Sequence, residues 1–269
     1  MASTLYIQLV SKSFAEQSDD WHKLAFPFCL VAGNPLDNAA GKTILQQGKQ
    51  SFSDLSEIAQ NASSVVLLMA ASDVSVMKVK VPPIPYAKIK LALPNLLEEQ
   101  LLADPSDCLF VSNPPKDGVC LVATIARSWM EKVLAAAAVL GARRLSAYAM
   151  SKSLLQENGE TSILIESASE VATQLNLSFK FPDQLAAGLT VDTGASAANS
   201  PEVCQQINDT VQLLAPQGAY HFYVDAAMLA PLQASLAEKL NEEIANPLEV
   251  PPAPKFSVLN WHHKIAGMD

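Results

Sequence analysis

Glycine and charged side chains are scarce in this sequence, and each shortage excludes a class of protein. The 269 residues include 10 glycines, about half the usual share for this length, which argues against a site built on glycine-rich phosphate loops. Charged residues make up 17% and hydrophobic residues 49%. Enough apolar surface is present to offset chain entropy, so disorder is excluded for most of the chain. The length fits one large domain or two smaller ones.

Basic residues are also in deficit, with 18 Lys and Arg against 27 Asp and Glu and a net charge of −9. Nucleic acid is excluded as a main partner, because phosphate contacts need clustered positive charge. Residues 1–145 carry equal numbers of positive and negative groups, so residues 146–269 hold the whole excess. This asymmetry indicates either an acidic surface that keeps the protein soluble or a surface that meets a basic protein.

The four cysteines lack any CxxC pairing and have apolar neighbours. We expect buried thiols in a reducing compartment. The first ten residues lack the basic start of a signal peptide. The longest strongly apolar helical stretch, residues 133–142, covers about half a membrane span. The chain is therefore predicted to be soluble and cytoplasmic.

Apolar periodicity in the first half predicts alternating strands and helices, which is typical of an α/β protein. Strands are predicted at residues 4–10, 26–31, 65–70, 74–81, 107–112, 119–125 and 145–150, and helices at 54–61, 85–102 and 129–140. Pro94 should kink or restart the helix that contains it. The alanine-rich helix 129–140 is so apolar that we expect it to lie between two layers.

The second half continues the alternation. Strands are predicted at residues 162–166, 171–175, 177–181, 189–191 and 220–224, and helices begin at Ser200 and at Pro231. Residues 246–254 contain four prolines and are interpreted as an extended linker. Residues 256–268 are interpreted as a tail with a tryptophan and two adjacent histidines. Since it ends shortly after a proline linker, the chain is expected to be a fragment of a longer protein.

One motif is similar to a phosphate-binding P-loop. Gly41-Lys42-Thr43 follows an apolar run, as the end of that motif does. Leu36 stands where the first glycine has to let the backbone wrap around the phosphates. Gly48 falls where a helix should run from its phosphate-facing N-terminus. A working P-loop is therefore not expected.

Two overlapping motifs are similar to hydrolase sites. Asp192-Thr193-Gly194 has the form of the aspartic protease signature, in which two such loops share a proton. The chain has one such loop, so only a symmetric homodimer would supply the pair, and we interpret the motif as a polar turn after a strand. Ser196 lies in a nucleophile elbow that lacks its second glycine. The four histidines show no spacing typical of a catalytic base or a metal site, so no catalytic, cofactor-binding or metal-binding residue is predicted.

An acidic edge is predicted on the proline-containing helix. Glu98 and Glu99 lie among leucines near its end, and Asp104 follows them. Paired carboxylates can perform acid–base catalysis. Consecutive helical positions point in different directions, however, so these two do not converge on one substrate. The edge is expected to be a solvated helix face or, as the alternative, a surface that binds a partner.

Several segments of the first half carry a family pattern. They are Val65-Val-Leu-Leu-Met-Ala-Ala-Ser-Asp-Val74, Val79-Lys-Val-Pro82 and Ala92-Leu-Pro-Asn-Leu-Leu-Glu-Glu-Gln100, with the opening Ser3-Thr-Leu-Tyr-Ile-Gln-Leu9 and Trp21. Together they resemble the cytoplasmic domain of the type II secretion system protein L family. The likeness is clearest over residues 60–130 and rests on element order beyond them. Residues 258–261 resemble the juxtamembrane segment of the family in part, and the tail departs from its usual pattern.

The resemblance implies an α/β, actin-like fold made of two ribonuclease-H-like halves with a strand–helix–strand–strand insertion. Residues 1–72 and 127–148 would form the first half, 73–126 the insertion, 149–245 the second half, and 246–269 a proline-rich linker and juxtamembrane tail. Actin-like ATPases hold nucleotide with a hairpin that contains Asp and Gly near the N-terminus, and residues 6–14 contain neither. The nucleotide site is therefore predicted to be degenerate, and no cofactor is expected.

The resemblance also implies a scaffold rather than an enzyme. Its implied partners are the secretion ATPase, bound through that enzyme's N-terminal domain, and other inner-membrane platform subunits, with a homodimer as a further option. The implied location is the cytoplasmic side of the bacterial inner membrane, with a transmembrane helix outside this sequence. The residues expected to face a partner are Glu98, Glu99, Asp104, Glu166 and Glu170.

The alternative is an actin-like ATP-binding hydrolase or kinase relative. Such a protein needs a phosphate cradle and a carboxylate that positions a metal ion. Asp192 is the one fair candidate for that carboxylate.

Overall fold

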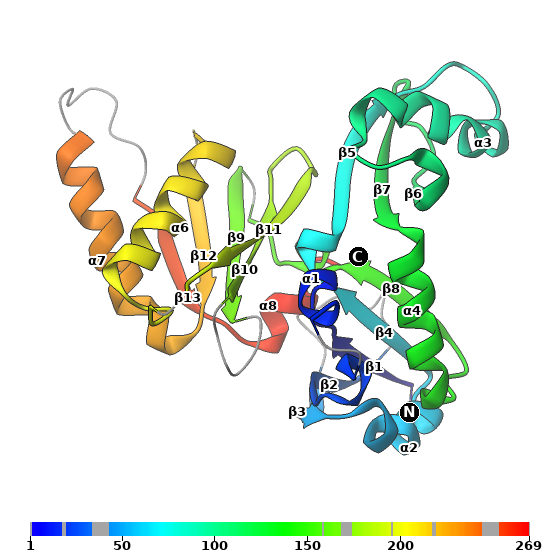
Figure 1. Ribbon diagram of the computed structural model, residues 1–269, viewed down its shortest axis with the longest axis horizontal. Coiled ribbons are helices and arrows are strands. Elements are labelled where there is room, and N and C mark those ends of the chain that lie inside the picture. The colour runs from blue at the N-terminus through cyan, green and yellow to red at the C-terminus, as the bar shows by residue number, and fades with distance from the viewer. Residues whose placement is uncertain are drawn as a thin grey trace.

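Two β-sheets organise the chain in this computed structural model, which describes residues 2–17, 20–33, 43–157, 159–167, 174–194, 196–216, 219–243 and 253–268. The first sheet has five strands in the order β3-β2-β1-β4-β8. The second has eight, in the order β13-β12-β9-β10-β11-β5-β7-β6. Figure 1 shows the two sheets beside each other, with the part that carries α3 extending away from the first sheet.

The first lobe consists of the first sheet and its helices. Its strands are β1 Ser3–Gln8, β2 Phe26–Ala32, β3 Thr43–Gln50, β4 Ser64–Met69 and β8 Leu145–Ala149, and its helices are α1 Lys12–Ala15, α2 Phe52–Asn61, α4 Arg127–Ala137 and α5 Met150–Ser153. Helix α2 begins two residues before its predicted start. The reason is that the Ser51 hydroxyl accepts a hydrogen bond from the Asp54 backbone N–H at 3.3 Å and so caps the helix.

The second lobe contains β9 to β13 and the helices that follow them. These elements are β9 Glu160–Ser167, β10 Gln174–Lys180, β11 Ala186–Asp192, α6 Pro201–Leu214, β12 Ala219–Val224, α7 Ala226–Glu243, β13 Lys255–Val258 and α8 Trp261–Ile265. The start of α6 agrees with the prediction, since Ser200 caps it and Pro201 is its first residue. Among the described residues, no helix combines the length and the apolar character needed to cross a membrane.

The insertion has the predicted order of strand, helix, strand and strand. Its elements are β5 Val74–Lys80, α3 Tyr86–Leu97, β6 Cys108–Ser112 and β7 Val119–Ala126, with short 3-10 turns η3 Ala71–Asp73, η4 Glu98–Gln100 and η5 Pro105–Asp107. The three strands extend the sheet of the second lobe, because β5 pairs with β11 through Ala186 and Val76. The insertion thus follows β4 in sequence but continues the other sheet.

The two lobes repeat one topology. In each, the first strand pairs antiparallel with the second and the second antiparallel with the third, and the first pairs in parallel with the fourth. The fourth then pairs in parallel with the fifth. Strands β1, β2, β3, β4 and β8 therefore correspond in order to β9, β10, β11, β12 and β13. This duplicated arrangement is the one expected of two ribonuclease-H-like halves.

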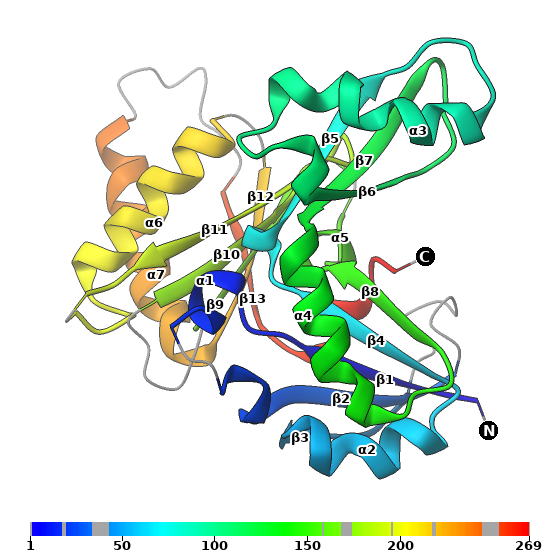
Figure 2. The same cartoon turned by 45° about the vertical axis from the view of Figure 1, so that its right-hand side comes forward.

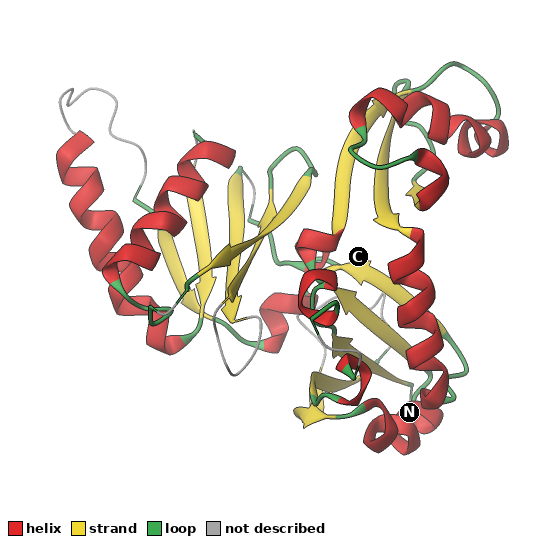
Figure 3. Ribbon diagram, viewed as in Figure 1, coloured by secondary structure: helices red, strands yellow, loops and turns green. Residues whose placement is uncertain are grey.

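Apolar side chains form three layers, one within each lobe and one between the two lobes. One lies between the first sheet and helices α2 and α4, and a second between the other sheet and helices α6 and α7 (Figures 2 and 3). The third lies between the two sheets. It includes Tyr6, Val66, Leu68, Leu164, Tyr223 and Ile265. Because successive side chains of a strand point to opposite faces, Val65 and Leu67 contact the helices while Val66 and Leu68 contact the other lobe. The double burial explains the unbroken apolar run of β4.

The C-terminal segment corrects the sequence interpretation. Residues 246–269 were expected to form a linker and a tail outside the fold, but Lys255–Val258 is strand β13, paired in parallel with β12. Phe256 stacks on Phe222 with ring centroids 5.1 Å apart. Helix α8 follows and lies between the lobes, as Figure 1 shows, with Ile265 fully buried. The described part of this segment, residues 253–268, therefore belongs to the folded body.

Helix α7 begins at Ala226, five residues before its predicted start at Pro231, and two further helix predictions also differ from the structure. Helix α4 was expected between two layers, but it buries one face, and Leu134 on the other is 48% exposed. Helix α3 continues through Pro94 to Leu97, and the tighter turn begins only at Glu98. In both cases packing of one apolar face decided the outcome over the local signal.

Candidate functional site

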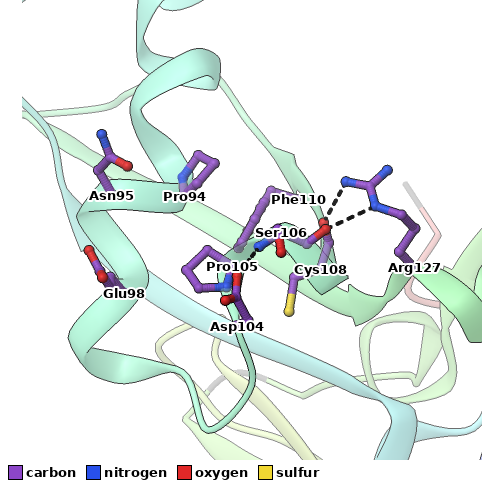
Figure 4. A pocket seen from close by; sticks show the side chains of 9 residues that line it. All are labelled: Pro94, Asn95, Glu98, Asp104, Pro105, Ser106, Cys108, Phe110 and Arg127. Atoms are coloured by element: carbon purple, nitrogen blue, oxygen red, sulfur yellow. Dashed lines mark hydrogen bonds between the residues drawn. The ribbon is translucent and has the colours of Figure 1, made fainter.

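A surface pocket of about 430 Å³ lies in the insertion, where the end of α3 faces η5 and β6 (Figure 4). Its lining residues are Pro94, Asn95, Glu98, Asp104, Pro105, Ser106, Cys108, Phe110 and Arg127. Two residues predicted to face a partner, Glu98 and Asp104, therefore share one depression. Arg127 stands at the opposite end of the pocket from Glu98.

Helix α3 exposes the acidic edge because its apolar residues recur at helical spacing. Ile89, Leu93 and Leu97 pack into the core of the insertion. Glu98 and Glu99 follow directly and are exposed, since the chain turns there into η4. Glu98 lines the pocket, whereas Glu99 does not. The structure thus separates two neighbours that the sequence had grouped.

Asp104 is held in place by the turn that it begins. Its side chain caps η5 and accepts a hydrogen bond from the Ser106 backbone N–H at 2.8 Å. Bonds from the Ser106 side chain and backbone lower the pKa of Asp104 from its usual value, so it is ionised at neutral pH. The pocket therefore carries a fixed negative charge at this point.

Arg127 supplies the positive charge and also covers the edge of the sheet. Its Nε donates to the Ser106 carbonyl at 3.1 Å, and its Nη2 donates to the Cys108 carbonyl at 3.0 Å. The Tyr86 hydroxyl donates to the carbonyl of Ser112, at the other end of edge strand β6. Both ends of this edge strand are thereby occupied, which hinders pairing with a strand of another chain. The guanidinium is held rigidly beside the pocket.

The chemistry of the pocket fits recognition better than catalysis. Burial, followed by the charges of Asp107 and Asp104, raises the pKa of the Cys108 thiol, so this buried group stays protonated. The charged groups of the pocket are exposed carboxylates and a guanidinium that donates to backbone carbonyls, and Asn95 and Ser106 add neutral polar side chains. Charges of both signs on a shallow surface are typical of the polar part of a protein interface.

The other two predicted partner residues have different positions. Glu166, near the end of β9, is 8% exposed, and its Oε2 accepts a hydrogen bond from Gln8 Nε2 at 2.9 Å. Its other oxygen accepts from the ammonium of Lys264, which also donates to Gln8 Oε1 at 2.7 Å. The carboxylate is therefore engaged inside the molecule, which corrects the expectation of a surface contact. Glu170 lies outside the described residues.

The Gln8–Glu166–Lys264 contact joins the two lobes. Gln8 ends β1 and Glu166 lies near the end of β9, the corresponding first strands of the two halves. Ligands of α/β proteins bind where the carboxyl ends of such strands meet. Here the buried ammonium of Lys264, brought by α8, contacts both strand ends. A phosphate group entering this junction would meet a carboxylate and would have to displace an internal ion pair.

The described parts of the motifs that are similar to catalytic sites adopt other local structures. Asp192 accepts a hydrogen bond from the Gly194 backbone N–H at 2.8 Å, and Gly194 has φ +57°, which confirms the polar-turn interpretation. Gly41 and Lys42 lie outside the described residues, but Thr43 begins strand β3 where a P-loop would begin a helix. His221 Nε2 lies 2.8 Å from the Ser257 hydroxyl, whereas the Ser196 backbone N–H donates to the Thr193 carbonyl at 3.0 Å within its turn.

Asp73, in η3, binds two helices of the first lobe near the point where the chain enters the insertion. Its Oδ2 accepts hydrogen bonds from the Lys12 backbone N–H at 2.8 Å and from Trp129 Nε1 at 3.1 Å. Burial is the largest influence on this group and raises the pKa of Asp73 to about 6, although both hydrogen bonds favour the charged form. Asp73 thus anchors α1 and α4 at an electrostatic cost.

This cost predicts a pH dependence of stability. Between pH 3.8 and about 6 the folded state holds a proton on Asp73 that the unfolded state has lost. The contribution of Asp73 therefore becomes less favourable as pH rises, by about 2 kcal/mol between pH 4 and 7. Urea unfolding of wild type and Asp73→Asn at both pH values measures it, and the variant should gain relative stability at pH 7. An equal difference at both pH values would contradict the assignment.

Sequence reasoning missed Arg127 and Lys264. Arg127 is the first residue of α4, where a positive charge opposes the helix dipole. That conflict was a local signal that the side chain serves another contact. Lys264 had no such signal, because its partners Gln8 and Glu166 lie 256 and 98 residues away in the sequence.

A protein-family model matches the part of the chain that contains the pocket. Residues 37–151 match the type II secretion system protein L family. The match includes the whole insertion and confirms the resemblance seen in the sequence motifs. None of the curated proteins matches the sequence.

Solved structures extend the likeness to the rest of the chain. The cytoplasmic domain of EpsL, an inner-membrane component of the type II secretion system of Vibrio cholerae, aligns with a TM-score of 0.62 and 14% identity, covering 98% of this chain and 93% of that one. A chain of the PilM–PilN type IV pilus biogenesis complex aligns with a TM-score of 0.57 and 13% identity, covering 88% and 86%. At these identities the likeness shows the fold, which is the actin-like fold implied by the sequence.

Proposed function

We propose that this chain is the cytoplasmic scaffold domain of an inner-membrane platform protein of type II secretion and that it recruits the secretion ATPase to the membrane. The observation that carries the proposal is the family match over residues 37–151. The likeness to the cytoplasmic domain of EpsL supports the same role on the cytoplasmic side of the inner membrane. The likeness to a chain of the PilM–PilN complex supports assembly with other platform subunits.

The insertion is the proposed contact for the ATPase. Glu98, Glu99 and Asp104 give it an acidic edge, and Arg127 is the cation held beside it. Such an edge favours a partner surface with a basic patch, and charge complementarity would raise the rate of association. A non-enzymatic role is supported by Lys264, which occupies the junction where an actin-like enzyme would hold phosphate.

Changing the acidic edge is expected to weaken ATPase binding at least tenfold. The test variant combines Glu98→Lys, Glu99→Lys and Asp104→Asn, and asparagine retains the ability to cap η5. Binding of the purified N-terminal domain of the ATPase is measured by isothermal titration calorimetry at low and high salt. Wild-type affinity should fall as salt rises, because exposed charges are screened.

Glu57→Lys is the matched control, since Glu57 is an exposed carboxylate in the middle of α2 in the first lobe. Its affinity for the ATPase domain should equal that of wild type. Equal loss in the control would show that net charge matters and the edge does not. Absence of wild-type binding at low salt, with both proteins folded, would overturn the proposed function.

Titration with ATP and Mg²⁺ tests the alternative function. An actin-like hydrolase or kinase relative would bind nucleotide, and a Kd below about 100 μM would favour that class. We expect no binding at this level, because Glu166 and Lys264 are already paired at the lobe junction.

A further inference from the structure

A polar cluster on the second sheet takes no part in the proposed ATPase contact. Strands β9, β12 and β13 are parallel neighbours, in which Ala219 pairs with Glu160 and His221 pairs with Lys255. Glu160, His221 and Lys255 consequently lie together on one face, and Glu157 joins them from the turn before β9. The cluster is about 20 Å along β9 from Glu166, at a rise of about 3.3 Å per residue. It is therefore separate from the lobe junction.

Three acceptor atoms of the cluster converge. His221 Nδ1 lies 3.9 Å from Glu157 Oε1 and 4.0 Å from Glu160 Oε2, and the three atoms are all within 4.8 Å of one another. The other carboxylate oxygens, Glu157 Oε2 and Glu160 Oε1, each lie 2.7 Å from the ammonium of Lys255. Lys255 thus holds the outer oxygens and leaves the inner ones facing the imidazole.

The imidazole presents a lone pair to this space. His221 is buried, with 8% of the residue exposed. When Nε2 donates to Ser257 Oγ at 2.8 Å, Nδ1 is an acceptor. The Tyr223 hydroxyl lies 3.3 Å from Nδ1. A histidine whose second nitrogen is held by a hydrogen bond is oriented in the way that metal ligands usually are.

One oxygen of the cluster has no partner at all. Glu160 Oε2 is buried and accepts no hydrogen bond in the structure, and the whole side chain is 13% exposed. An unpartnered buried carboxylate oxygen is costly, and it faces a second carboxylate and an imidazole lone pair. A cation among these three atoms would satisfy each of them.

We propose that Glu157, Glu160 and His221 bind a divalent transition-metal cation of the Zn²⁺, Mn²⁺ or Co²⁺ class. One imidazole nitrogen and two carboxylate oxygens are ligands that these ions accept. Ligands about 2.1 Å from such an ion stand roughly 3 to 4 Å apart, close to the 3.9 and 4.0 Å found here. The ligands come from adjacent strands and a short turn, so little rearrangement is needed. The ion would join β12 to the start of β9.

A serine–histidine–carboxylate relay is the other chemistry that this cluster suggests. Ser257 and His221 are within hydrogen-bonding distance. The 3.9 and 4.0 Å separations between His221 Nδ1 and the carboxylates are too long for the hydrogen bond that would orient the ring in such a relay. A metal ion can lie between His221 Nδ1 and the two carboxylate oxygens at these separations without strain.

The test is titration of ZnCl₂, MnCl₂ and CoCl₂ into the full chain after dialysis against EDTA. Calorimetry should show one ion per chain for at least one metal, and that ion should raise the midpoint of thermal unfolding. Glu160→Gln and His221→Gln should each weaken binding by about tenfold or more. His262→Gln is the control, since His262 is exposed in α8, and its affinity should equal that of wild type.

Lys255→Met distinguishes a metal site from a purely structural ion-pair cluster. Loss of the ammonium removes a cation that competes for the same carboxylates, so metal affinity should rise about tenfold while the metal-free protein loses stability. A structural cluster would lose stability without binding metal. The proposal is overturned if neither wild type nor Lys255→Met takes up one equivalent of any of the three ions at 100 μM. It is also overturned if His221→Gln retains wild-type affinity.

Discussion

Lys264→Met is expected to lower the free energy of unfolding by about 4 kcal/mol. The ammonium and the Glu166 carboxylate are each 10% exposed, and removal of one partner leaves the other charge buried and uncompensated. Gln8 would still donate to Glu166, but a neutral amide does not replace the charge. Urea unfolding at pH 7 measures the loss, and circular dichroism establishes that the variant remains folded.

The double variant Lys264→Met with Glu166→Gln separates loss of charge balance from loss of packing. Removing both charges of a buried pair costs far less than removing one, so most of the lost stability should return. A double variant as unstable as Lys264→Met would show that packing of the lysine stem matters more than the balance of charge with Glu166. A loss below about 1 kcal/mol in the single variant would place this pair among weak surface contacts.

Gly188→Ala is expected to lower the free energy of unfolding by about 3 kcal/mol. A Cβ at this position of β11 would stand 2.0 Å from the carbonyl carbon of Ala71 and 2.3 Å from the backbone nitrogen of Ser72. Both atoms belong to η3, the turn that connects the first lobe to the insertion. Backbone atoms cannot rotate aside as a side chain can, so η3 and β11 must separate. Thermal and urea unfolding measure the loss.

Gly48→Ala is the matched control for that change. Gly48 also lies in a strand, and its new Cβ would stand 3.4 Å from the Phe28 ring, an ordinary contact. The substitution should be neutral or slightly stabilising, because alanine reduces the freedom of the unfolded chain. A Gly188→Ala protein as stable as this control would mean that β11 and η3 are not closely packed.

Local sequence pattern predicted an element correctly where residues within that element determine its structure. The apolar run at residues 65–70 predicted a strand, and β4 is that strand, buried on both faces because helices cover one side and the other lobe covers the second. Ser200 and Pro201 predicted the start of α6 because capping depends on neighbours within one turn. The family motifs around Pro94 identified the insertion, whose order of elements was predicted correctly.

Local sequence pattern failed to predict an element that is stabilised by contacts with another part of the chain. Residues 255–258 follow four prolines and are too short to read as a strand, and β13 exists because β12 supplies its hydrogen-bond partners. Part of the candidate pocket could likewise not be predicted from local sequence pattern. Glu98 and Asp104 were found from their exposure in an acidic stretch, but Arg127, which completes the pocket, was not predicted to have a role.

The sequence alone determined the alternation of strands and helices, the buried strands and the insertion. It also showed that a glycine-rich phosphate-binding loop is not expected. Each of these features depends on residues that are close together in the chain. Tertiary structure decided that Glu166 faces inward, that α8 lies between the lobes and that Glu157, Glu160 and His221 converge. These contacts join residues from about 60 to more than 250 positions apart. No local periodicity encodes such pairings, because they follow from how two sheets pack and not from the propensity of any one segment.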